Sequence, residues 1–214
     1  MMKKMKKQLL FIVMLGLIGC VKETQEIKAV EENLKGNRVL MIIASSNFRD
    51  EEYLVPVDIL KSYGIEIITA CSSLQVSTGM LGAKVTPDIL LTKVKVEDYD
   101  AIVFVGGTGS SEYWEDKTAH HLILEAISQN KILAAICIAP VTLANAGVLN
   151  GKSATVFFTE ADRLKEKGAN YSGKDVVIDE NIITANGPQS AEKFAQAIVN
   201  LLSPKILPVK DEKR

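Results

Sequence analysis

The sequence predicts a single α/β domain, a three-layer α/β/α sandwich with a mostly parallel central sheet. From Arg38 onward, short runs of β-branched and aliphatic residues alternate with longer amphipathic segments. Buried strands that alternate with helices imply right-handed crossover connections and helices on both faces of the sheet. The 214 residues, of which 47% are hydrophobic, are enough for one core and some sequence outside it.

The expected strands are short apolar runs bounded by turn residues. They cover residues 38–44, 65–72, 99–107, 131–137 and 153–158. Two short strands are expected within residues 75–87, and two weak strands before the last helix. The expected helices are amphipathic, and the first of them ends at Gly64. They cover residues 50–64, 119–129, 139–146, 160–167 and 190–202.

The first 19 residues have the pattern of a bacterial lipoprotein signal peptide. Lysines precede an apolar run from Leu9 to Gly19, and Cys20 follows it. This run is too short to span a bilayer but suits the hydrophobic region of a signal. Small residues before the cysteine resemble a lipobox, so we expect Cys20 to carry a lipid that anchors the protein to a membrane. The alternatives are an ordinary secretory signal or a short buried helix.

This interpretation divides the chain into four parts. They are a signal peptide at 1–19, the lipidated cysteine with a polar spacer at 20–36, a domain at 37–205 and a tail at 206–214. The expected location is the cell envelope, with the domain on the extracytoplasmic side of the membrane.

The charge balance argues against nucleic acid as a partner. The formal net charge is −1, and no basic run is interleaved with aromatic residues in the domain. Without the four lysines of the signal, 21 of the 25 basic residues remain against 26 acidic ones, a formal charge of −5. Only Cys71 and Cys137 then remain as thiols in the fold, too few for a disulfide framework although one bridge is permitted. We expect Cys71 to be a buried thiol.

The segment Ala134 to Pro140, AAICIAP, places Cys137 where an expected strand turns into a helix. Ligands of parallel α/β sheets bind at the carboxyl ends of the strands, where this residue lies. The placement is like that of a nucleophile elbow, and a helix start favours a thiolate. The alternative is a buried cysteine that behaves as a small hydrophobic residue.

Other residues at these strand ends provide partners for the thiol. The backbone amides of Gly107 and Ile138 are candidates for an oxyanion hole. Asp50 and Glu51 suit a solvated helix start, whereas Glu52 is the acid expected to turn inward, with a raised pKa. The glycines after residue 105 lack the full G-x-G-x-x-G pattern of a dinucleotide site.

The two histidines are adjacent in the sequence and are expected at the surface. They are His120 and His121. Neighbours on a helix do not share a face, so they do not predict a metal site. We expect no cofactor.

Four motifs in register resemble the ThiJ/PfpI family of the class I glutamine amidotransferase-like superfamily. They are RDEEYLVPVDIL, YDAIVFVGGTGSSEYW, AAICIAP with LANAGVLNGKSATVF, and IITANGPQSAEKFAQAIVNLL, and together they span residues 38–203. The resemblance implies a flavodoxin-like sandwich that forms a homodimer. It also implies a reactive cysteine at Cys137 and a carboxylate four residues before the helix proline, which is Glu52 because the proline is Pro56.

Two positions depart from this family's pattern. Family peptidases carry histidine directly after the nucleophile, where this chain has Ile138. Members related to a deglycase and chaperone often carry a histidine about where Phe157 stands. Both differences remove an imidazole that would generate a thiolate, so peptidase activity is the least supported of the family's functions.

Two functions remain as hypotheses. In the first, Cys137 adds to a small carbonyl substrate such as a glyoxal, the amides of Gly107 and Ile138 hold the oxyanion, and glyoxalase- or deglycase-like hydrolysis follows. In the second, Cys137 is oxidised in a non-enzymatic sensor or chaperone-like protein. A solute-binding module is disfavoured because a clamshell receptor needs a second lobe.

Overall fold

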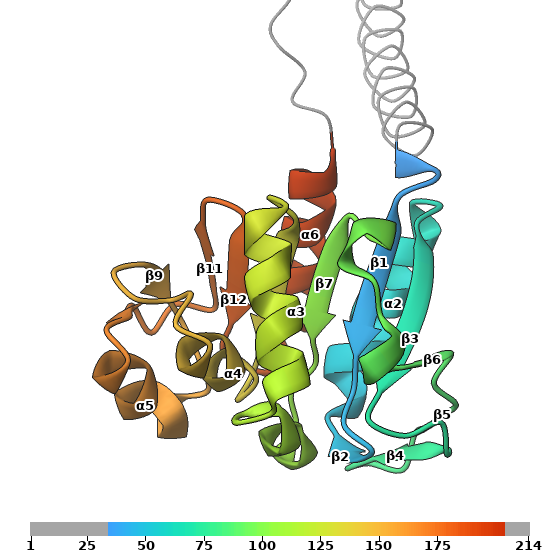
Figure 1. Cartoon of the computed structure of the whole chain (residues 1–214), viewed down its shortest axis with the longest axis horizontal. Coiled ribbons are helices and arrows are strands. Elements are labelled where there is room, and N and C mark those ends of the chain that lie inside the picture. The colour runs from blue at the N-terminus through green and yellow to red at the C-terminus, as the bar shows by residue number, and fades with distance from the viewer. Residues whose placement is uncertain (1–33, 204–214) are drawn as a thin grey trace, which may run out of the picture.

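The structure is a computed structural model that describes residues 34–203. Its centre is a seven-stranded sheet in the order β11-β12-β8-β7-β1-β3-β6 (Figure 1). The strands are β1 Arg38–Ile42, β3 Glu66–Cys71, β6 Ile89–Leu90, β7 Ala101–Phe104, β8 Ile132–Ile136, β11 Val176–Asp179 and β12 Ile182–Ala185. Only the edge pair β11 and β12 is antiparallel in this sheet. The expected α/β class with a mostly parallel sheet is therefore confirmed.

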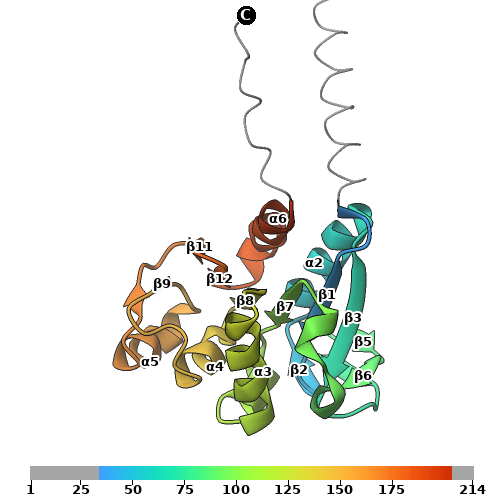
Figure 2. The ribbon, with the colours of Figure 1, turned by 45° about the horizontal axis from the view of Figure 1, so that its top comes forward.

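Helices cover both faces of the sheet (Figure 2). One face carries α2 Asp50–Ser62 and α6 Ala191–Leu202, and the other carries α3 Lys117–Ser128, α4 Pro140–Asn145 and α5 Ala161–Glu166. Alternation along β1 produces these two cores, because successive side chains of a strand point to opposite faces. Val39 and Met41 pack with α2 and α6, whereas Leu40 and Ile42 pack with α3.

The remaining elements are short. Strands β2 Ser46–Phe48, β4 Ser77–Gly79 and β5 Lys84–Val85 form a small sheet, and β9 Ser153–Ala154 pairs with β10 Asn170–Tyr171. The 3-10 helices are η1 Leu91–Lys93, η2 Val96–Asp98, η3 Thr108–Tyr113, η4 Phe158–Glu160 and η5 Pro188–Ser190. Strands β2 and β6 were not expected from the sequence.

The expected strand at 153–158 is wrong in its length and in its place. Only Ser153 and Ala154 are in a strand, and β9 does not join the seven-stranded sheet. Thr155 donates its N–H to the Thr184 hydroxyl over 2.9 Å, and Phe157 donates its N–H to the Cys137 carbonyl over 2.8 Å. These two N–H groups therefore bond to partners other than the backbone of a neighbouring strand. The apolar pattern at 153–158 is present, but it does not form a long strand.

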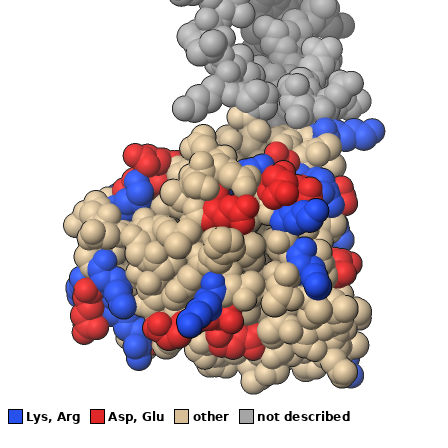
Figure 3. All heavy atoms as spheres, viewed as in Figure 1, with Lys and Arg blue, Asp and Glu red and all other residues tan. Residues whose placement is uncertain are grey.

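The described chain begins and ends at the end of the sheet where the central strands begin, opposite their carboxyl ends (Figure 1). The expected signal peptide, Cys20 and the tail at 206–214 lie outside the described residues. Within residues 34–203, no helix is long and apolar enough to cross a membrane. Basic and acidic side chains are interspersed on the face that Figure 3 shows.

Candidate functional site

Cys137 lies in a strained turn between β8 and α4. Its φ is +63°, which is uncommon for a residue with a side chain. The backbone is held on both sides, because its N–H donates to the Ala185 carbonyl over 2.9 Å and its carbonyl accepts from Phe157 N–H over 2.8 Å. Such strain persists only where neighbouring structure fixes it. Here the strained turn presents the thiol directly after the end of β8. The side chain is 8% exposed.

Glu52 points inward from the first turn of α2. It is fully buried, and neither carboxylate oxygen has a partner with full hydrogen-bond geometry among residues 34–203. Burial raises the pKa of Glu52 to about 8, although the Cys137 thiol as a hydrogen-bond donor, the positive charge of Arg49 and the Gly106 amide act to lower it. Below about pH 8 Glu52 is therefore a neutral acid that faces the sulfur.

The glycine pair after β7 makes room for this arrangement. A side chain at Gly106 would overlap both the Glu52 carboxylate and Cys137, whose Cβ would lie 2.5 Å from the added atom. Gly107 has a φ of +95°, and its Cα faces the backbone between Asn47 and Arg49. Glycine is thus required at Gly106 for the acid and the thiol to meet, and at Gly107 for close packing against the backbone of residues 47–49.

The electrostatics of the thiol depend on Glu52. Burial and then the negative charge of Glu52 raise the pKa of Cys137 to about 12, whereas the amides of Gly107 and Ile138 lower it. The two expected oxyanion amides are therefore brought to the sulfur. The expectation that the helix start favours a thiolate was wrong, because burial and the neighbouring acid outweigh the amides. Because Glu52 and Cys137 interact strongly, the loss of the first proton is a property of the pair and not of either group alone. A thiolate at Cys137 forms more readily while Glu52 keeps its proton, because no carboxylate charge then opposes it.

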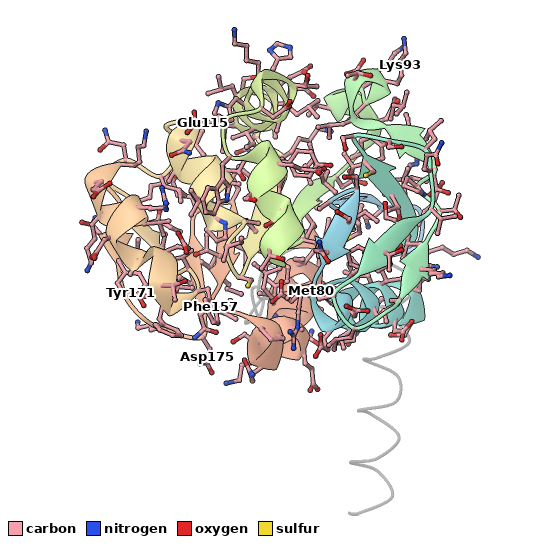
Figure 4. The ribbon with its side chains drawn as sticks, turned by 90° about the horizontal axis from the view of Figure 1, so that it is seen from below. Met80, Lys93, Glu115, Phe157, Tyr171 and Asp175 are labelled. Atoms are coloured by element: carbon pink, nitrogen blue, oxygen red, sulfur yellow. The ribbon has the colours of Figure 1, made fainter. Side chains whose placement is uncertain are left out.

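The thiol opens into a cleft of about 400 Å³, a volume that suits a small molecule. Its lining is Arg49, Glu52, Met80, Gly107, Thr108, Cys137, Ile138, Phe157, Thr159, Glu160, Pro188 and Gln189. Met80 and Phe157 are labelled in Figure 4, which views the molecule from the edge where the central strands end. The lining thus combines apolar side chains with charged, hydroxyl and amide side chains beside the thiol.

Two expectations for acidic residues are resolved by the structure. Asp50 was expected in solvent, but it is 5% exposed and accepts hydrogen bonds from the N–H groups of Leu81 and Ala83. This expectation was wrong because the loop before β5 folds over the helix start. Glu51 is partly exposed and pairs with Arg49 at 2.8 Å.

The histidines lie away from the cleft lining. His121 is exposed, as expected, but His120 is half-buried and its Nε2 donates to the Trp114 carbonyl over 2.8 Å. The surface assignment of His120 was therefore wrong. Within the described part of the chain, no three His, Cys, Asp or Glu residues are grouped so that they could hold a metal ion. Cys71 is fully buried and, like Cys137, is a free thiol.

Sequence reasoning missed several contributors to the site. Arg49 lines the cleft, the backbone of Phe157 holds the elbow, and Trp114 donates its indole N–H to the Ile138 carbonyl over 3.3 Å. Arg49 could have been found from its position three residues before Glu52, because a residue at a helix start lies near the next inward residue. The Phe157 and Trp114 contacts join distant segments, and no local pattern signals them.

Comparisons with known proteins identify relatives of this chain in sequence and in fold. An uncharacterised protein of Methanocaldococcus jannaschii is 38% identical over 203 residues, which cover 92% of this chain and 98% of that protein. A Caenorhabditis elegans protein named glutathione-independent glyoxalase DJR-1.2 is 30% identical, covering 76% of this chain and 87% of its own. The crystal structure of a ThiJ/PfpI domain protein from Brachyspira murdochii matches with a TM-score of 0.77 and 33% identity, covering 78% and 97% of the two chains. The DJ-1/PfpI family model matches residues 37–201, and the chain is a member of that family.

Proposed function

We propose that the protein is a cysteine-dependent enzyme that acts on small reactive aldehydes by glyoxalase- or deglycase-like chemistry. The observation that carries this proposal is the fully buried Glu52 carboxyl, neutral below about pH 8, beside the Cys137 thiol in an open cleft. The relative named as a glyoxalase, 30% identical, supports the same chemistry.

The proposed reaction begins when the Cys137 sulfur adds to the aldehyde carbon of a 2-oxoaldehyde. The C=O double bond becomes a single bond, and the thiol proton reaches the oxygen through Glu52. The amides of Gly107 and Ile138 stabilise the negative charge that develops in this step. A proton then moves from the former aldehyde carbon to the neighbouring ketone carbon, and the hydroxyl proton moves to the ketone oxygen. The former aldehyde carbon regains its C=O double bond and is now a thioester, and the former ketone is a hydroxyl group. Water hydrolyses this thioester to a 2-hydroxy acid and restores the thiol.

The test is to incubate the purified full chain with methylglyoxal, without glutathione, and to measure lactate. We expect lactate formation that is lost in Cys137→Ala and is about 10²- to 10⁴-fold slower in Glu52→Gln, which keeps the shape but cannot carry the proton. Cys71→Ala is the matched control, because that thiol is fully buried and is not part of the cleft lining. Full activity in Cys137→Ala would exclude the proposal.

A second candidate function is an oxidation sensor or protective protein. Its specific support is that the neutral Glu52 carboxyl, which has no partner of full hydrogen-bond geometry among residues 34–203, can donate a hydrogen bond to an oxidised sulfur. Mass spectrometry after mild peroxide treatment should find sulfinic acid at Cys137 and none at the fully buried Cys71. If Cys137 stays unmodified while methionines oxidise, this function fails.

Peptidase activity is not part of the proposal. Neither histidine of the chain lines the cleft, and the residue after the nucleophile is Ile138. A thiol with a raised pKa and no imidazole beside it is poorly suited to attack an unactivated amide.

We also propose a location and an assembly. The lipobox-like segment supports a lipid on Cys20 and a place in the cell envelope, and the family resemblance supports a homodimer. The described chain begins at the end of the sheet opposite the carboxyl ends of the central strands. The residues that line the cleft lie at those carboxyl ends, so a tether at the opposite end leaves the cleft open. Cys20→Ala should release the protein from the membrane fraction, and sedimentation of the detergent-solubilised chain should give the dimer mass. An unchanged membrane fraction or a monomer mass would contradict these assignments.

A further inference from the structure

Arg49 supplies a fixed cation to the cleft. Its backbone N–H donates to the Gly106 carbonyl over 2.9 Å, which places the residue beside the glycine pair. Its guanidinium donates two hydrogen bonds to the Glu51 carboxylate, from Nε over 2.8 Å and from Nη2 over 3.0 Å. The Arg49 side chain is 27% exposed, and the residue is part of the cleft lining. The ion pair therefore orients the guanidinium from one side.

The guanidinium retains donors for a ligand. An arginine has five N–H donors, and the two bonds to Glu51 leave three of them. Glu51 itself is not among the lining residues, so its carboxylate does not fill the cleft. The negative forms of Glu52 and Cys137 both help to raise the pKa of Arg49, after the larger effect of Glu51, so the cation lies within electrostatic reach of the thiol.

The other charges at the cleft do not compete strongly with Arg49. Glu52 is neutral below about pH 8. Glu160 accepts a hydrogen bond from Arg163 over 2.8 Å and from the Thr159 hydroxyl over 3.0 Å. Among the described residues that line the cleft, Arg49 is the only cation. A small anion that enters would therefore find its opposite charge at this residue.

We propose that Arg49 forms an anion subsite, so that Cys137 adds most readily to small aldehydes that carry a carboxylate beside the reacting carbonyl. This ligand class rests on the proposed function, because it uses the same addition step at Cys137, and it extends the site to a residue outside the proposed catalytic pair. Glyoxylate has no ketone carbon to receive a shifted proton, so its reaction ends at this addition. With glyoxylate, the sulfur forms a bond to the aldehyde carbon and the C=O double bond becomes a single bond. The thiol proton ends on the former carbonyl oxygen, and the unchanged carboxylate accepts hydrogen bonds from Arg49.

The test compares two alkylating reagents of the same shape, the anion iodoacetate and the neutral iodoacetamide. Rates at Cys137 are measured on the full chain at pH 7.5 by peptide mass spectrometry. We expect the ratio of the iodoacetate rate to the iodoacetamide rate to exceed that of free cysteine, and to fall about tenfold in Arg49→Gln. The ratio should also fall as salt is added. Arg38→Gln is the matched control, since Arg38 is also paired with a glutamate, at 3.1 Å, but begins β1 at the opposite edge.

A second measurement uses reversible ligands. Glyoxylate should slow iodoacetamide alkylation of Cys137 more strongly in the unmodified chain than in Arg49→Gln, whereas neutral glyoxal should protect both equally. A reagent ratio like that of free cysteine, an unchanged ratio in Arg49→Gln, or no reaction of Cys137 with either reagent would overturn the subsite. Neither measurement needs turnover, so the two proposals can fail separately. If the protein forms lactate but the ratio of reagent rates is unchanged in Arg49→Gln, the subsite alone is refuted. If the protein forms no lactate but the ratio falls as expected, the proposed function alone is refuted.

Discussion

At the scale of single residues, the proton shared by Glu52 and Cys137 should control reactivity. The rate of Cys137 alkylation by iodoacetamide should rise with pH up to about 8, because Glu52 is still neutral there. Above this pH the carboxylate charge opposes thiolate formation, so the rise should become less steep, continuing toward the thiol pKa of about 12. In Glu52→Gln the break near pH 8 should disappear and alkylation at pH 9 should be faster. The break should remain in Glu51→Gln, and its persistence in Glu52→Gln would contradict the assignment.

Individual site residues differed in how far the sequence could predict them. Cys137 and Glu52 could be inferred because one ends a strand and the other lies inward at a helix start, and the structure brings them together. Asp50 could not be inferred, because its partners Leu81 and Ala83 lie in a loop that no pattern places on the helix. His120 was misjudged for the same reason, since its partner is a backbone carbonyl in a neighbouring turn.

At the scale of elements, Asp50 should fix the position of the β4–β5 turn against α2. Its two oxygens accept N–H bonds of 2.8 and 2.7 Å, and Asp50→Ala leaves both donors without this partner at a partly buried position. We expect a loss of about 2 kcal/mol in the free energy of unfolding, measured with urea. Because Met80 lies in this turn and lines the cleft, the rate of Cys137 alkylation by iodoacetamide should also change in Asp50→Ala.

The control for this prediction is Glu51→Ala, in which a partly exposed ion pair is lost at the same helix start. Its effect on stability should stay within about 1 kcal/mol. Equal losses in the two variants would show that the turn does not depend on Asp50.

The order of elements was predictable from hydrophobic periodicity, whereas the pairing of short strands was not. The helix at Asp50–Ser62 and the strand at Ile132–Ile136 lie within their expected ranges. The segment at 153–158 failed because Thr155 and Phe157 bond to a side chain and to the elbow, which are contacts set by tertiary structure. β2 pairs with β4 in a separate small sheet, and a three-residue strand has no periodicity of its own to detect.

At the scale of the whole molecule, the buried acid should make the stability of the fold depend on pH. Glu52 has a pKa of about 8 in the folded protein against 4.5 in the reference state. Below pH 4.5 the acid is protonated in both the folded and the unfolded chain. As pH rises from 4.5 to 8, the unfolded chain loses this proton while the folded chain keeps it, so the free energy of unfolding falls. Above pH 8 the decrease in the free energy of unfolding that Glu52 causes is complete.

This dependence is tested by urea unfolding of the full chain and of Glu52→Gln at pH 5, 6, 7 and 8. The stability of the unmodified chain relative to the variant should fall by an amount on the order of a few kcal/mol across this range. Cys137 does not disturb the comparison, because its folded pKa of about 12 and its reference value of 9.0 both lie above it. Parallel curves for the two proteins would mean that Glu52 is ionised in the fold, and the proton that the proposed reaction requires would then be missing at neutral pH.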